Sequence, residues 1–153
     1  MTFDLAAVLP MLLPRAIAWA EVNSGEILAS GLPLNTREIS IARAVGVASP
    51  ERIRIMLVET IPLPQDAELK AAALGAELFG PDSRGLTLGY GIYIVQRAQS
   101  DRLLAHECRH VYQYEWAGSI AQFLPVYLQQ IDKYGYANAP FEVEARQYES
   151  TVV

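Results

Sequence analysis

The most informative stretch of the chain is residues 100–118, which reads SDRLLAHECRHVYQYEWAG. Ser100 or Asp101 can cap the start of a helix, because a short oxygen-bearing side chain accepts a hydrogen bond from a free backbone N–H of the first turn. Gly118 is the residue type that commonly ends one. The sequence therefore predicts a helix over residues 102–116.

An HExxH motif lies in the first turns of this helix, from His106 to His110. Residues four apart project from the same helix face, so both imidazoles can reach one metal ion, and Glu107 lies close enough to hold a water bound to that metal. Zinc suits imidazole, and with an open position it lowers the pKa of bound water to about 7. We predict that His106 and His110 bind Zn²⁺ and that Glu107 is the general base.

Composition limits the class of protein. A chain of 153 residues with 52% apolar and 19% charged residues fits a single domain, residues 1–153, with a substantial core. A net charge of -5 without a basic stretch argues against nucleic-acid binding. Cys108 is the only cysteine, which excludes an intramolecular disulfide and a Cys-rich zinc site. We expect a cytoplasmic protein.

The N-terminus carries an apolar run, Leu5 to Leu13, that could mimic a signal peptide. No Lys or Arg precedes it, and Pro10, Pro14 and Arg15 interrupt it well short of the roughly 20 residues of a membrane span. An interfacial membrane anchor would need a basic polar face, which the run lacks. We interpret it as a core or interface segment, followed by a helix from Pro14 to about Ser30.

The rest of the chain mixes helices with strands. Asn35 and Glu38 form the pattern of a capping box for a second helix, and Ile53, Ile55 and Leu57 alternate as in a half-buried strand. We predict strands at 52–59 and 86–95, and further helices from Asp66 to Phe79, from Ile120 to Tyr134 and from Pro140 to about Tyr148. This pattern predicts an α+β fold, helix-rich, with a small twisted sheet against the HExxH helix.

The segment from Leu86 to Ser150 resembles the gluzincin metallopeptidases, most of all the short members called minigluzincins. It carries a strand, then the HExxH helix, then a later helix containing FEVEAR at residues 141–146. The resemblance implies a zincin-like fold, peptidase activity and a glutamate from the later helix as third zinc ligand. Residues 1–85 match no such pattern and are assigned as supporting helices and strand.

Glu142 and Glu144 are both candidates for the third ligand, and they would point in different directions from one helix because they are two residues apart. The family ligand commonly stands three residues before a small residue, which favours Glu142 and implies Arg146 as its partner. Glu144 stays open as the alternative. Glu115 and Asp132 are the other downstream carboxylates, and they lack the family context.

The resemblance also implies how substrate binds and reacts. An extended peptide would pair with the strand beside the cleft, where Gly89 and Gly91 would either let its backbone approach or mark a bulge. A nearby donor would stabilise the oxyanion, and Tyr134 and Tyr136, on either side of Gly135, are the first candidates. The other tyrosines considered are Tyr112, Tyr114 and Tyr127. Most of those tyrosines, like Gln113 nearby, are expected to serve packing.

The prediction is therefore a zinc-dependent metallopeptidase acting on peptide or protein substrates, with His106, His110 and Glu142 as metal ligands and Glu107 as base. The alternative is a catalytically silent or latent zinc-binding module that serves interaction or regulation, in which the N-terminal half covers the metal. Access to the fourth coordination position separates the two, because catalysis needs it open whereas a structural site closes it with protein.

Overall fold

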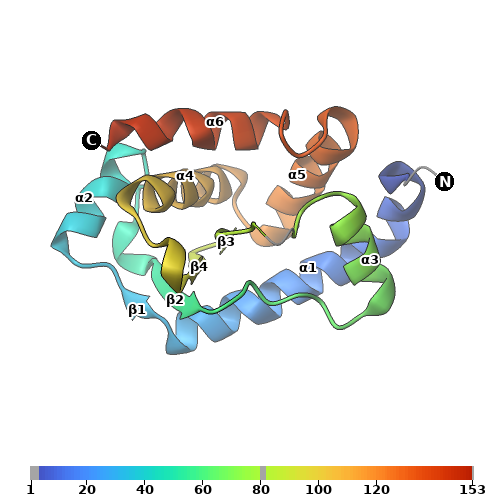
Figure 1. The fold of residues 1–153 in the computed structure, drawn as a ribbon, viewed down its shortest axis with the longest axis horizontal. Helices are drawn as coiled ribbons and strands as arrows, with labels where there is room; N and C mark the ends of the chain where they lie inside the picture. The colour runs from blue at the N-terminus through green and yellow to red at the C-terminus, as the bar shows by residue number, and fades with distance from the viewer. Residues whose placement is uncertain (1–3, 80–81, 153) are drawn as a thin grey trace.

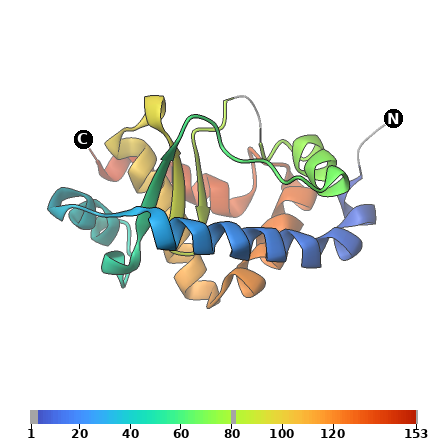
Figure 2. The same cartoon turned by 90° about the horizontal axis from the view of Figure 1, so that it is seen from below.

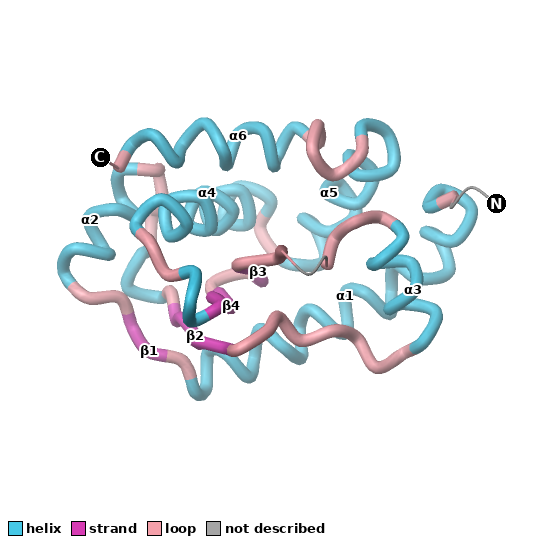
Figure 3. The backbone as a smooth tube through the Cα atoms, in the orientation of Figure 1, coloured by secondary structure: helices cyan, strands magenta, loops and turns pink. Residues whose placement is uncertain are grey.

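The computed structural model describes residues 4–79 and 82–152 and has an α+β fold that is mostly helical (Figures 1 and 3). Within these residues six α-helices accompany one small mixed sheet of four strands. The helices are α1 Leu5–Ser30, α2 Thr36–Ala44, α3 Ala67–Gly75, α4 Asp101–Ala117, α5 Ile120–Tyr134 and α6 Pro140–Tyr148. The strands are β1 Leu32–Pro33, β2 Arg54–Val58, β3 Gly85–Leu88 and β4 Gly91–Val95. Short 3₁₀ turns cover Pro50–Arg52, Gln96–Ala98 and Glu149–Thr151.

Helix α1 begins earlier than the sequence predicted. Asp4 caps it by accepting a hydrogen bond from the Ala7 amide, and both Pro10 and Pro14 lie inside the helix instead of Pro14 starting it. A proline removes one hydrogen-bond donor and favours a first-turn position, so the prediction overweighted Pro14. Within the described residues α1 is also the one helix long and apolar enough to cross a membrane by length and composition, a test that core helices and signal sequences pass too.

The sheet has the strand order β1-β2-β4-β3, in which β2 and β4 are parallel and the other two pairs are antiparallel. The single strand predicted over residues 86–95 is in fact a hairpin, with Leu88 paired to Gly91 across a two-residue turn. Gly89 has φ +67° and is the first central residue of that turn, a position that takes glycine in type II′ hairpins. The hairpin leaves β3 at the edge of the sheet.

Helices cover both faces of the sheet (Figure 2). Alternate side chains of β4 point to opposite faces. Ile92 and Ile94 pack in one core with α4 and α2, whereas Tyr93 and Val95 pack in another core with α1. Gly91 lies against α1, where an added Cβ would stand 3.0 Å from the Ile27 Cβ. Gly89 therefore forms the hairpin turn and Gly91 makes room for α1, where the sequence had left substrate approach and a bulge as alternatives.

The N-terminal half of α1 extends beyond the sheet, where it contacts α3 and α5 (Figures 1 and 2). Helix α3 ends earlier than the predicted Phe79, because Glu77 adopts φ 62° just after the cap residue Ala76. The predicted bounds of α5 and α6 agree with the structure. Helix α6 lies along α4 and brings its acidic residues over the HExxH helix.

Candidate metal centre

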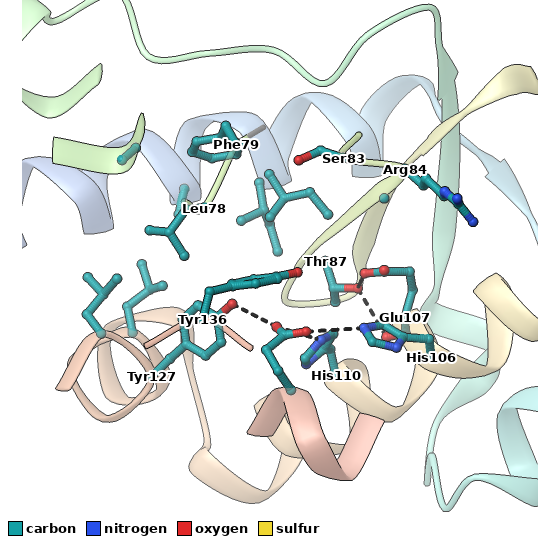
Figure 4. Close-up of a pocket in the computed structure, with 18 of the residues that line it drawn as sticks. Leu78, Phe79, Ser83, Arg84, Thr87, His106, Glu107, His110, Tyr127 and Tyr136 are labelled. Carbon is teal, nitrogen blue, oxygen red and sulfur yellow. Dashed lines mark hydrogen bonds and ion pairs between the residues drawn. The ribbon is translucent and has the colours of Figure 1, made fainter. Parts of the chain in front are cut away.

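Three side chains from two helices converge as a possible metal site (Figure 4). His106 and His110 project from one face of α4, and Glu142 reaches them from α6, with one ligand atom of each lying within 4.8 Å of the others. His106 Nε2 lies 3.3 Å from Glu142 Oε1, and His110 Nε2 lies 3.1 Å from Glu142 Oε2. Ligand atoms of a tetrahedral zinc site, each about 2.0–2.1 Å from the metal, stand about 3.3 Å apart. Each imidazole thus has a different oxygen of Glu142 beside it, and the three residues could hold a metal ion.

Each histidine is oriented by a further side chain. His106 Nδ1 lies 2.9 Å from Glu149 Oε2, and His110 Nδ1 lies 2.8 Å from Gln113 Oε1. An acceptor at Nδ1 favours the tautomer that leaves Nε2 free for a metal. Gln113, which was expected to serve packing, thus holds His110, and its amide nitrogen donates to Glu144 Oε2 at 2.7 Å. The sequence did not point to Glu149, because this residue reaches α4 only through the 3₁₀ turn at Glu149–Thr151.

The three ligands are strongly coupled electrostatically. Burial opposes charge on Glu142, but His110, His106 and the Tyr127 hydroxyl outweigh it and hold the pKa of this carboxyl well below its usual range. Burial likewise opposes the charged form of His110, yet Glu142 overcomes it and raises the pKa of His110 to about 9. Without metal, the buried carboxylate therefore keeps a proton on the imidazole that a metal ion would have to displace.

Glu107 is held by the edge strand β3. The Thr87 hydroxyl lies 2.8 Å from Glu107 Oε1 and 3.1 Å from its backbone carbonyl oxygen. Gly85 leaves room for the same carboxylate, since a Cβ there would stand 2.9 Å from Glu107 Oε2. The side chain of Glu107 is buried next to the two histidines. The sequence analysis missed Thr87 and Gly85, because their contact joins a strand and a helix across about twenty residues of chain.

Two tyrosines stand beside Glu142, and only one of them was a first candidate. The Tyr127 hydroxyl donates a hydrogen bond of 2.7 Å to Glu142 Oε2. The ring of Tyr136 lies over the cluster in Figure 4, and burial together with Glu142 raises the pKa of its hydroxyl. Tyr134 is 46% exposed, lies beside Lys133 and does not line the pocket, so the structure does not bring it to the site. Gly135, with φ +78°, turns the chain between Tyr134 and Tyr136.

Glu144 has other partners. It forms an ion pair of 3.1 Å with Arg109, whose guanidinium stacks between Tyr112 and Tyr148 at 3.7 and 3.9 Å from their ring centroids. The predicted partnership of Arg146 with Glu142 is not found, because Arg146 Nη2 donates to the Ala137 carbonyl instead. The alternative third ligand thus faces away from the histidine pair.

The remaining acidic candidates lie elsewhere. Glu115 accepts hydrogen bonds from the amides of Ala48 and Ser49 at 2.8 and 3.0 Å and from the Tyr90 hydroxyl at 2.7 Å. Asp132 is exposed on α5. Cys108 is fully buried in the core between α4 and the sheet, as a small apolar side chain would be.

The cluster opens into a pocket of about 650 Å³. His106, Glu107, His110, Glu142 and Tyr136 all line it, so a ligand entering the pocket reaches the metal-binding side chains and the candidate base together. Helices α1, α3 and α5, the edge strand β3 and the residues 82–84 before it form its other walls. Residues from both halves of the chain thus line the pocket, and the N-terminal half contributes the walls from α1 and α3.

Comparison with models of protein families, with curated proteins and with solved structures finds no match to this chain.

Proposed function

We propose that this protein is a zinc-dependent metallopeptidase with a zincin-like fold of the gluzincin type. The observation that carries the proposal is the convergence of His106, His110 and Glu142, with one ligand atom of each within 4.8 Å of the others, beside Glu107 on the wall of a pocket. Two imidazoles and one carboxylate are the ligand set of catalytic zinc sites that keep one position free. A structural site would have all four positions filled by protein.

Glu107, Thr87 and Tyr136 then each have a separate role in hydrolysis. A bound zinc ion would polarise the scissile carbonyl and make water a nucleophile near neutral pH. Glu107 accepts the proton of the attacking water and delivers it to the leaving amine, while Thr87 keeps its carboxylate in place. The Tyr136 hydroxyl, kept protonated by its raised pKa, donates a hydrogen bond to the carbonyl oxygen as negative charge develops there.

The edge strand β3 offers the main-chain contacts. Arg84 accepts a 2.8 Å hydrogen bond from the Val95 amide, so the antiparallel ladder turns every second residue of β3 toward β4. The backbone groups of Gly85 and Thr87 consequently face the open edge. An extended peptide pairing there runs directly past Glu107.

The alternative is a silent zinc-binding module with the same ligands. The lining of the pocket favours the enzyme, because a module that uses zinc only to join α4 to α6 has no need of Glu107 beside the metal or of a cavity of about 650 Å³ in front of it. The enzyme and the binding module predict different effects of Glu107→Gln on peptide cleavage.

The deciding experiment compares the purified protein with Glu107→Gln and with Glu21→Gln, a matched change on the exposed face of α1. Zinc content is measured in all three, and each is assayed for cleavage of casein. We expect about one zinc per chain in each and cleavage by the parent and Glu21→Gln alone. If all three proteins contain zinc and none cleaves casein, the protein is the zinc-binding module. If none of them contains zinc, both proposed functions are wrong about the metal.

A further inference from the structure

The pocket has a second region beyond the metal cluster, which we call the apolar arm. It is walled by Leu5, Leu9, Leu12 and Ala16 on α1, together with Leu69 on α3 and Leu128 on α5. The α1 residues are spaced by four, three and four positions, so they form one continuous stripe on that helix. At a rise of 1.5 Å per residue this stripe is about 16 Å long.

The arm is continuous with the metal site through two tyrosines. Tyr127 and Tyr136 belong to the same apolar cluster as Leu5, Leu9 and Leu78, whereas the Tyr127 hydroxyl donates a hydrogen bond to Glu142. In Figure 4, Leu78 and Phe79 lie on the opposite side of the Tyr136 ring from His106 and Glu107. Because the arm and the metal cluster line one pocket, a molecule with a polar reactive end and an apolar tail can occupy both regions at once.

The apolar lining of the arm favours an alkyl chain over a peptide backbone as its occupant. Every residue that α1 and α3 contribute to the pocket is apolar, and Trp19 supplies the one polar side-chain atom among them, its indole nitrogen. A peptide backbone in this arm would leave buried N–H and C=O groups without partners, which costs free energy at each residue. An alkyl chain has no such groups, and a stripe of about 16 Å is longer than any amino-acid side chain.

We propose that the apolar arm binds the long alkyl chain of an acylated substrate, with its acyl amide at the metal centre. The cleavage step rests on the proposed hydrolase function, whereas binding in the arm does not. In that step the water oxygen bonds to the acyl carbon and the carbon–nitrogen bond breaks. The nitrogen takes one proton by way of Glu107, and the fatty acid formed releases the other to solvent.

The hydrolysis test uses N-acetyl, N-octanoyl and N-myristoyl forms of one tripeptide with the zinc-loaded protein. Burying one methylene contributes about 0.8 kcal/mol, so we expect kcat/KM to rise about fourfold for each methylene that the arm accepts. Ala16→Leu, which fills the arm, should remove the gain from octanoyl to myristoyl. Ala18→Leu is the matched control, because Ala18 is exposed on the same helix and does not line the pocket.

Binding is measured separately by tryptophan fluorescence. The chain has two tryptophans, and Trp116→Phe leaves Trp19, which lines the pocket, as the only one. Combined with Glu107→Gln, this variant should show a saturable change with the myristoylated tripeptide and none with the acetylated one. The change should weaken when Ala16→Leu is added and persist when Ala18→Leu is added.

The outcomes separate the two proposals. Fluorescence binding of the myristoylated tripeptide without hydrolysis would keep the acyl site and reject the hydrolase. Hydrolysis that ignores chain length, without fluorescence binding, would reject the acyl site and keep the hydrolase. Cleavage of unacylated apolar peptides with no gain from acylation would assign the arm to peptide side chains and overturn the proposal.

Discussion

Thr87 Oγ1 lies 2.8 Å from Glu107 Oε1, so the edge strand and the HExxH helix meet at the candidate base. A hydroxyl that donates to a carboxylate fixes one of its oxygens and leaves the other to receive a proton from water. The strand thus contributes a side chain as well as main-chain groups to the proposed chemistry.

Replacing Thr87 by valine keeps the shape of the side chain and removes the hydroxyl. A hydrogen bond to a charged group contributes about 1.5–3 kcal/mol, so we expect kcat for peptide hydrolysis to fall about tenfold or more. Zinc content should stay unchanged, because Thr87 is not a ligand. Thr87→Ser keeps the hydroxyl and should retain most of the activity. Equal activity of the valine and serine variants would remove Thr87 from the mechanism.

Zinc affinity distinguishes the two glutamates of α6. Glu142→Gln should lower affinity by more than about a hundredfold, because the effect of losing a ligand exceeds the 10–100-fold effect of losing a ligand's orienting partner. Glu144→Gln should lower it only modestly, through Gln113 and His110. Competition with a chromophoric chelator measures both. The opposite ranking would make Glu144 the ligand.

The local parts of this site were predictable from the sequence, and the parts assembled across the fold were not. The helix around His106 and His110 has its own cap at Ser100 and its own stop at Gly118, so spacing alone places both imidazoles on one face. The choice of Glu142 came from a resemblance and agrees with the observed convergence. Thr87 reaches Glu107 because β3 packs against α4, and such packing leaves no periodic pattern in the sequence.

Proline and glycine account for two of the errors in the fold. Pro14 resembles a helix start, yet α1 continues through it because the Asp4 cap and the buried Leu5 and Leu12 stabilise the preceding turns. Gly89 resembles a bulge within one long strand, yet its positive φ makes the turn between β3 and β4. Both residues allow two local structures, and tertiary contacts decide between them.

Zinc binding should release protons at neutral pH. In the metal-free protein the pKa of His110 is raised to about 9, so at pH 7 its imidazole is mostly protonated and must lose that proton to bind metal. Apparent affinity should therefore rise with pH, by about tenfold per unit for each proton released, and level off above about pH 9. Titration calorimetry in buffers of different ionisation enthalpy counts the protons. A heat independent of the buffer would contradict the raised pKa.

Two tyrosines that flank Gly135 make a matched pair for the oxyanion donor. Tyr136→Phe removes the hydroxyl of a half-buried side chain that lines the pocket beside the cluster, and loss of one such donor lowers kcat by about 10²–10³-fold in known hydrolases. Tyr134→Phe removes an exposed hydroxyl outside the pocket and should leave kcat unchanged. Because the donor acts when charge develops on the carbonyl oxygen, KM should change little in either variant. If Tyr136→Phe raised KM at constant kcat, Tyr136 would bind substrate without stabilising the transition state.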